Sequence, residues 1–349
     1  MSHKNEWHHQ VIALANTNTI SWRGIAEMVG KPRSTVSDFL RKYYKEISED
    51  KADDMSPQIC YPVDEPSIQF EEIKYETVFK IVTDPTKQEG THLFIPDTQC
   101  KPNISLDYLK WLGQYIVRKK PDVIIHAGDH ADMESLSEYD KGKKSAEGKR
   151  VQEDINSAIE GMEVLLEPLY NLQQAELEEF GEIKYKPRLV LTLGNHENRI
   201  NRYVDSTPAL HGFLSVADLK YEEFGWEVIP FLTPVDIGGI FYVHYLQNVM
   251  NGKPLGGNAA SMLKTIGKSF SVGHKQTLDV ATRFLQVDGT QQWGLQCGSY
   301  YEHEEDYKGV QGNKHFRGVI LKHGVKDGSY NPCFVSIEWL KEQYGKDSF

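Results

Sequence analysis

The sequence predicts an α/β fold in which two packed sheets are flanked by helices, preceded by a small domain of three short helices. Strand-like and helix-like runs alternate from about residue 76 onward, which is typical of mixed α/β domains. The length of 349 residues suits one catalytic domain with a smaller appendage. Residues 1–47 contain seven Lys and Arg residues against four acidic ones, although the whole chain has a net charge of −11. A basic segment ahead of an acidic body indicates two functions in one chain.

Three short helices are predicted within residues 1–47. Apolar residues at helical spacing begin at Trp7, and the second helix starts at an N-cap, Ser21, and stops at Gly30. The third helix is expected over residues 34–44. A short helix, a turn containing glycine and a second short helix form the helix-turn-helix pattern, and this segment resembles small helix-turn-helix DNA-binding domains.

The third helix carries the side chains expected to bind DNA. Its start and its outward positions offer cations and hydroxyl groups, which bind phosphates and base edges. The predicted DNA contacts are Lys31, Arg33, Ser34, Thr35, Ser37, Arg41 and Lys42. A helical bundle used for packing or dimerisation is the alternative. Because one small helix-turn-helix usually needs a second copy for specific binding, a homodimer is expected.

Residues 48–75 are predicted to be a flexible linker, because they are acidic, interrupted by prolines and free of periodic apolar residues. The larger domain is expected over residues 76–349. Apolar and β-branched runs there predict strands, and amphipathic spacing predicts helices. The expected strands are Thr91–Ile95, Asp122–Ala127, Arg188–Leu193, Glu227–Phe231, Ile240–Val243, Phe270–Val272, Phe316–Leu321 and Phe334–Ile337. The expected helices are Leu106–Val117 and Val151–Leu172.

Composition excludes several classes of protein. No apolar run approaches the roughly 18 residues that a membrane span needs, and the first ten residues are too polar for a signal peptide. The four cysteines are scattered without paired spacing, which argues against a disulfide framework or a zinc ribbon. A cytoplasmic protein without a membrane partner is therefore expected.

Metal-binding residue types follow the ends of five predicted strands. They occur in the stretches Asp97-Thr98-Gln99, Gly128-Asp129-His130-Ala131-Asp132, Gly194-Asn195-His196-Glu197, His244, and Gly273-His274-Lys275-Gln276. The carboxyl ends of strands in α/β sheets are where ligands collect. One such cluster is commonly a cap or a loop, but five in one chain predict a metal site.

The order of these stretches resembles that of the calcineurin-like metallophosphoesterases, over roughly residues 91–277. Gly-Asn-His-Glu is the most specific element. As a whole, the chain looks like phage-type members that carry a helix-turn-helix ahead of the phosphoesterase domain. The resemblance implies a sandwich of two mixed sheets with helices outside, and a centre of two divalent metals that clamp a phosphate and activate a water.

Carried over by resemblance, Asp129 would bridge two metals, and Asn195, His244 and His274 would complete one intact site. The other site would use Asp97, residue 99, Asp129 and residue 276. The family has His at 99 and 276, whereas this chain has Gln99 and Gln276.

An amide oxygen is a harder and weaker ligand than an imidazole nitrogen. We call the site formed by Asp97, Gln99, Asp129 and Gln276 the Gln site. It is therefore expected to bind its metal weakly, with a preference for Mn²⁺ or Mg²⁺. Mn²⁺ is the metal that we expect the protein to use, and Fe²⁺ and Zn²⁺ also suit the intact site. An empty Gln site, in a one-metal or inactive relative, is the alternative.

The resemblance also implies a role for each remaining motif residue. His196 would be the proton donor to the leaving oxygen, unless it only packs beside the ligands. Asp132 and Glu197 would orient metal ligands. Arg199 would neutralise substrate phosphate, or else be a surface cation.

Three functions fit these predictions. The first is a metal-dependent phosphodiesterase, a nuclease recruited to duplex DNA by its helix-turn-helix. The second is a phosphomonoesterase or protein Ser/Thr phosphatase whose helical module binds a partner. The third is a DNA-binding regulator with a weakly active phosphoesterase domain. Charge asymmetry favours the first, since tethering raises local DNA concentration.

Overall fold

The computed structural model describes residues 6–15, 25–26, 28–31, 35–36, 39–40, 42, 79–138, 142–144, 147–304 and 313–345. The chain divides into two compact units, Met1–Ile73 and Lys74–Phe349, and each is described by itself. The predicted linker and the predicted DNA contacts Arg33, Ser34, Ser37 and Arg41 lie outside the described residues.

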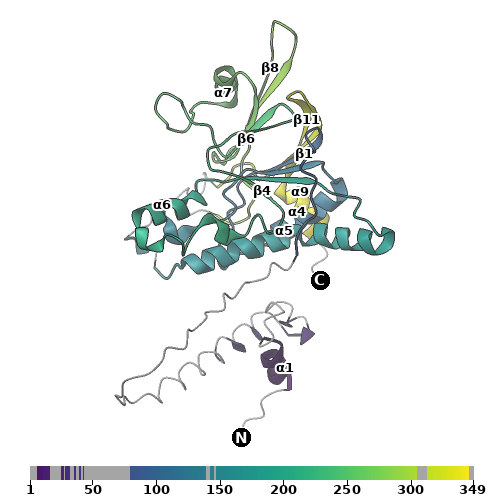
Figure 1. Ribbon diagram of the computed structural model, residues 1–349, viewed down its shortest axis with the longest axis vertical. Helices are drawn as coiled ribbons and strands as arrows, with labels where there is room; N and C mark the ends of the chain where they lie inside the picture. The colour runs from purple at the N-terminus through teal and green to yellow at the C-terminus, as the bar shows by residue number, and fades with distance from the viewer. Residues whose placement is uncertain are drawn as a thin grey trace, which may run out of the picture. The chain divides into compact units, whose positions relative to one another are not determined.

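The first unit contains α1 (Glu6–Ala15), drawn in purple in Figure 1. Residues 25–26, 28, 35–36, 39–40 and 42 are also helical. A small apolar core joins these segments, and its buried residues are Val11, Ala15, Ile25, Ala26, Val36 and Leu40. Lys31, Thr35 and Lys42 are exposed. The helix-turn-helix arrangement and its DNA contacts stay predictions.

The second unit contains two mixed sheets. The six-stranded sheet has the order β11-β10-β1-β2-β3-β4, and the five-stranded sheet has the order β5-β6-β7-β9-β8. The strands of the first are β1 (Gly90–Ile95), β2 (Val123–His126), β3 (Arg188–Thr192), β4 (Glu227–Ile229), β10 (Gly318–Lys326) and β11 (Ser329–Ser336). Those of the second are β5 (Val235–Ile237), β6 (Ile240–Val243), β7 (Ser269–Val272), β8 (Asp279–Phe284) and β9 (Gln291–Gln296).

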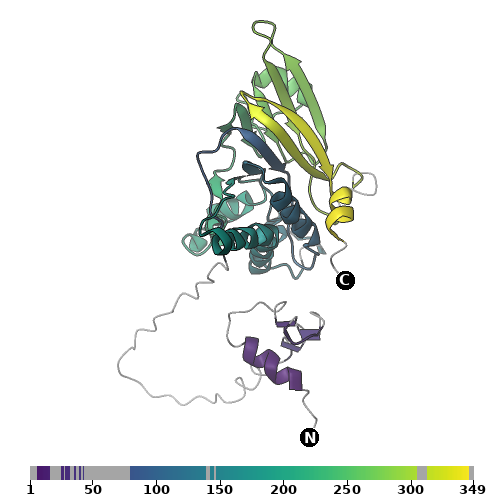
Figure 2. The same cartoon turned by 90° about the vertical axis from the view of Figure 1, so that its right-hand side faces the viewer.

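Helices cover the outer face of each sheet (Figures 1 and 2). They are α4 (Asp107–Lys119), α5 (Val151–Phe180) and α9 (Ile337–Tyr344) on the six-stranded sheet and α7 (Ala259–Ile266) on the five-stranded sheet. Helix α6 (Asn198–Ser206) follows β3 and packs against short 3-10 segments such as Glu134–Leu136. Alternation along β1 shows the layers: Leu93 and Ile95 pack toward α4 and α5, whereas Phe94 packs against the second sheet. On the far side of the second sheet, Phe270 of β7 packs against α7. The predicted α/β sandwich is therefore present.

Strand direction brings the predicted motifs together. Strands β1, β2, β3 and β4 are mutually parallel, and β6 is parallel to β7. Their carboxyl ends therefore meet at corresponding edges of the two sheets, where the loops begin. The backbone turns sharply there, since Gln99, Asp129 and His274 all have positive φ, between 43° and 66°.

The element ends differ from the predicted ones where side-chain patterns are ambiguous. Helix α5 runs eight residues past the predicted end at Leu172. Its last two turns are mostly polar and solvent-facing, so the apolar spacing that predicted the helix is missing there. Strand β10 continues to Lys326, and Ile337 begins α9 instead of ending a strand. No described helix has both the length and the apolar composition needed to cross a bilayer.

Candidate metal centre

Both sheets supply residues to one polar site. From the six-stranded sheet come Asp97 and Gln99 after β1, Asp129 after β2, and Asn195 after β3. From the five-stranded sheet come His244 directly after β6 and His274 with Gln276 after β7. The site therefore lies across the junction of the two sheets.

Two glycines allow these loops to approach one another. A Cβ at Gly194 would overlap the Asp129 carboxylate, and a Cβ at Gly273 would overlap Asp97 Oδ1 and the Ala127 side chain. A larger residue at either position would push the loops apart. This steric requirement explains why glycine precedes the ligand-type residues in these two motifs.

Asp129, His244 and His274 form a group whose potential ligand atoms all lie within 4.8 Å of one another. His244 Nε2 is 3.2 Å from Asp129 Oδ2 and 2.9 Å from Asn195 Oδ1. His244 Nδ1 donates to the Ala127 carbonyl at 2.8 Å, which orients Nε2 toward the other ligands. The structure thus brings together all four residues of the predicted intact site.

The pKa values show a site that holds positive charge. Burial alone would lower the pKa of His244, but Asp129 raises it to about 9, because the buried carboxylate favours positive charge beside it. Burial and His244 lower the pKa of His274 to about 4, which leaves it neutral and able to ligate a metal. Burial opposes ionisation of Asp129, yet His196 and His244 lower its pKa overall.

The Gln site contains two buried oxygens that have no hydrogen-bond partner among the described residues. Asp97 is fully buried; its Oδ1 accepts the His274 N–H at 3.1 Å, while Oδ2 has no hydrogen-bond partner among the described residues. Gln99 is 1% exposed, and its Oε1 is equally without a described partner. Unpaired buried oxygens cost roughly 1–3 kcal/mol each. A divalent cation would satisfy both, so the residues present fit a metal with oxygen ligands.

Burial and the neighbouring Asp129 raise the pKa of Asp97 to about 7. Two carboxylates in a dry site repel each other, and a cation between them relieves that repulsion. The Gln276 amide oxygen is less available to a metal than that of Gln99, because Gln276 Oε1 accepts a hydrogen bond from the Tyr301 hydroxyl at 2.8 Å.

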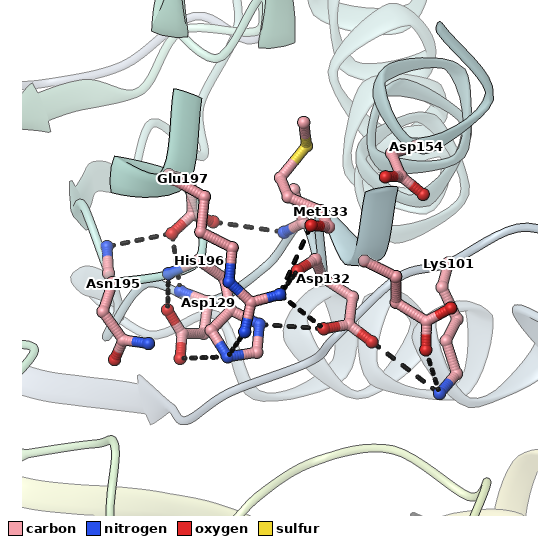
Figure 3. Close-up of polar contacts among 12 residues, drawn as sticks. Lys101, Asp129, Asp132, Met133, Asp154, Asn195, His196 and Glu197 are labelled. Atoms are coloured by element: carbon pink, nitrogen blue, oxygen red, sulfur yellow. Dashed lines mark hydrogen bonds and ion pairs between the residues drawn. The ribbon is translucent and has the colours of Figure 1, made fainter. Parts of the chain in front are cut away.

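His196 lies beside this group and contacts three charged residues (Figure 3). Its Nδ1 is 2.9 Å from Asp132 Oδ1, and its Nε2 is 3.7 Å from Asp129 Oδ2. Arg199 Nη2 is 3.0 Å from Nε2, so a neutral ring that accepts from Arg199 carries its proton on Nδ1, beside Asp132. Burial alone would lower the pKa of His196, but Asp129 and Asp132 raise it.

Glu197 holds the loops after β2 and β3 together (Figure 3). The buried carboxylate accepts hydrogen bonds from four backbone N–H groups and one hydroxyl; the donors are Asp129, His130, Ala131, Gly194 and Tyr221. Glu197 thus binds the backbone beside the ligands and touches no ligand side chain in these contacts.

Other residues support the site without a recognisable sequence signal. His126 Nε2 donates to Thr98 Oγ1 at 3.1 Å, and Thr98 donates to His130 Nδ1 at 2.8 Å. His130 Nε2 donates to the Ala158 carbonyl, so this ring is engaged in the core. The relay anchors Thr98 between the two residues of the Gln site. Only His126 could have been noticed in the sequence, because it is a polar residue at the end of a buried strand. No feature of the sequence indicates that Tyr301 contacts Gln276.

The same region of the chain is similar to known proteins. Residues 91–280, more than half of the chain, match the calcineurin-like phosphoesterase family. The Gene 54 protein of Mycobacterium phage L5 is 26% identical over 212 residues, which cover 59% of this chain and 77% of that protein. The matched region includes every residue placed here at the metal centre.

Proposed function

Because the chain belongs to the calcineurin-like phosphoesterase family, which typically binds divalent metals, we propose that this metal-dependent hydrolase is a phosphodiesterase that cleaves DNA. The observation that carries the narrower function is the charge distribution. Basic residues exceed acidic ones in residues 1–47, ahead of an acidic catalytic unit that contains all the metal-site residues. An acidic unit binds long polyanions poorly, so DNA affinity must come largely from elsewhere in the chain.

In this proposal two divalent metals bind, with Mn²⁺ preferred. Asn195, His244 and His274 would hold one ion, Asp97, Gln99 and Gln276 would hold the other more weakly, and Asp129 would serve both. When bound, these ions polarise the phosphate and supply an activated water. The close carboxylates and the unpaired oxygens of Asp97 and Gln99 support a second cation.

His196 is proposed to donate a proton to the leaving oxygen. Asp132 fixes the imidazole through Nδ1 at 2.9 Å and leaves Nε2 to face the substrate. In the substrate-free state Arg199 occupies that nitrogen, so its guanidinium must turn away before His196 can act. A phosphate oxygen is a natural acceptor for Arg199, which would couple substrate binding to release of the proton donor.

The proposal is tested by comparing four substrates with Mn²⁺: single-stranded DNA, duplex DNA, bis-(p-nitrophenyl) phosphate and p-nitrophenyl phosphate. A DNA phosphodiesterase hydrolyses DNA and the small diester faster than the monoester. Preferential hydrolysis of p-nitrophenyl phosphate would instead support a phosphomonoesterase. Absence of hydrolysis on all four, with DNA binding retained, would support a regulator.

Deleting residues 1–47 is expected to remove most duplex affinity while leaving hydrolysis of bis-(p-nitrophenyl) phosphate within about twofold, because the metal-site residues lie in the second compact unit. Duplex binding is measured over a range of salt concentrations. In the full chain, expected to bind as a homodimer, Arg33→Ala should reduce the salt slope by about 1 for each protomer. Equal duplex affinity of the full and shortened chains would contradict recruitment by this segment.

Restoring histidine at both Gln positions is expected to tighten the weaker metal. The double variant Gln99→His/Gln276→His should bind the second Mn²⁺ at least roughly tenfold more tightly, the scale on which changes around a metal alter affinity. Metal analysis after dialysis measures the number of retained ions. Gln247→His, at an exposed glutamine, is the matched control and should change nothing. Two tightly held ions in both the wild type and the double variant would contradict a weak Gln site.

A further inference from the structure

Lys322 of β10 is a fully buried lysine in the space between the two sheets. Its Nζ lies over three aromatic rings, 5.0 Å from the centroid of Phe94, 4.4 Å from that of Tyr242 and 4.8 Å from that of Tyr330. No carboxylate forms an ion pair with it within the described part of the chain. A buried lysine without a counter-ion is costly, so its presence calls for a reason.

Hydrogen bonds from Lys322 cross from one sheet to the other. Nζ donates to Ser271 Oγ at 2.6 Å and to the Tyr242 hydroxyl at 3.2 Å. Tyr242 in turn donates to His92 Nδ1 at 2.9 Å, and His92 Nε2 donates to the Gln88 carbonyl at 3.0 Å. Lys322, Tyr242 and His92 each donate to a defined acceptor, so the network favours one arrangement of these side chains.

The positions of these residues in the sheets relate the network to the metal centre. Lys322 and His92 are directly opposite each other in the β10–β1 pair of the six-stranded sheet. Tyr242 and Ser271 are directly opposite each other in the β6–β7 pair of the five-stranded sheet. Strands β6 and β7 end one residue later, and His244 and His274 follow.

The metal centre depends on the alignment of the two sheets. Asp129 comes from the six-stranded sheet, whereas His244 and His274 come from the other, yet their ligand atoms lie within 4.8 Å. The packing between the sheets is largely apolar, through residues such as Ile320 and Leu295. Apolar packing is non-directional, so it opposes a shift of one sheet along the other only weakly. Hydrogen bonds between the sheets fix both distance and angle.

We propose that Lys322 is a positioning residue: by binding Tyr242 and Ser271 from the opposite sheet, it sets the alignment that brings His244 and His274 to Asp129. This inference rests on the proposed metal site. It concerns metal affinity and makes no use of the DNA substrate. Burial lowers the pKa of Lys322 well below its usual range, and the amine donates to both hydroxyl groups.

Lys322→Met tests the proposal, because methionine has similar length and an apolar end. The variant should bind Mn²⁺ about tenfold more weakly by calorimetry, while the midpoint of thermal unfolding without metal stays equal or rises. Ile320→Val is the matched control in the same inter-sheet layer; it should lower the unfolding midpoint and leave Mn²⁺ affinity unchanged. If Lys322 had only a structural role, its replacement would change Mn²⁺ affinity and the unfolding midpoint together.

Ser271→Ala serves as a second and milder variant, since it removes the shortest Lys322 hydrogen bond and keeps the amine. Ser271→Ala should also weaken Mn²⁺ binding, by less than Lys322→Met. If Lys322→Met does not fold, the Mn²⁺ affinity of Ser271→Ala tests the positioning role. Unchanged Mn²⁺ affinity in a folded variant would overturn the positioning role, as would a loss that matches its thermal destabilisation. Absence of Mn²⁺ binding by the wild type would overturn the metal site as well, whereas failure to cleave DNA leaves this inference intact.

Discussion

Asp129→Ala is expected to abolish Mn²⁺-dependent hydrolysis, with a loss of at least roughly 10³-fold. Metal ions contribute several kcal/mol to such reactions, and each 1.36 kcal/mol is about tenfold in rate. Asp129 is the one described carboxylate that lies close to both His244 and His196, at 3.2 Å and 3.7 Å. Without it His244 would lose its described ion-pair partner, and the carboxylate proposed to serve both metals would be missing.

Metal binding distinguishes this effect from misfolding. Mn²⁺ should raise the unfolding midpoint of the wild type and not that of Asp129→Ala, because only a ligand that binds the native state stabilises it. His274→Ala should behave in the same way. His211→Ala is the histidine control, since His211 is exposed and lies outside the ligand group. Hydrolysis above about a tenth of the wild-type rate in Asp129→Ala would contradict the assigned ligand role, since the expected loss corresponds to several kcal/mol.

His196→Ala is expected to lower DNA cleavage by roughly 10²–10⁴-fold, while hydrolysis of bis-(p-nitrophenyl) phosphate falls much less. A proton donor matters most for a poor leaving group such as a sugar alkoxide, and least for p-nitrophenolate. The substitution removes the imidazole but keeps the backbone N–H that Asp129 Oδ1 accepts at 2.8 Å, so metal binding should be retained.

Asp132→Asn provides a graded companion to this variant. It weakens the contact that orients His196, so it should show the same dependence on the leaving group with a smaller loss. Metal content of both variants is measured alongside the rates. Equal losses on the two substrates would show that His196 supports the site in general and is not the proton donor.

The catalytic domain was largely predictable because its buried strands and its motifs are both local in sequence. Short apolar runs ending at Ile95, His126 and Val243 predict strands, and polar residues directly after them predict loops. Strands β5, β8 and β9 were missed, and β5 has only three residues. β8 is an edge strand in which charged, small and apolar residues are mixed without alternation, and glutamines interrupt β9, so neither resembles a buried strand.

The sequence by itself determined which residues can ligate a metal, since ligand chemistry belongs to the side chain and the motifs place each side chain at a strand end. Only the tertiary structure decided which oxygens lack partners, as for Asp97 and Gln99, because a hydrogen bond depends on what lies opposite in space. It also decided the place of Lys322, whose two acceptors are 80 and 51 residues away along the chain. Contacts between sheets join segments whose separation is unrelated to their local pattern, so local periodicity carries no information about them.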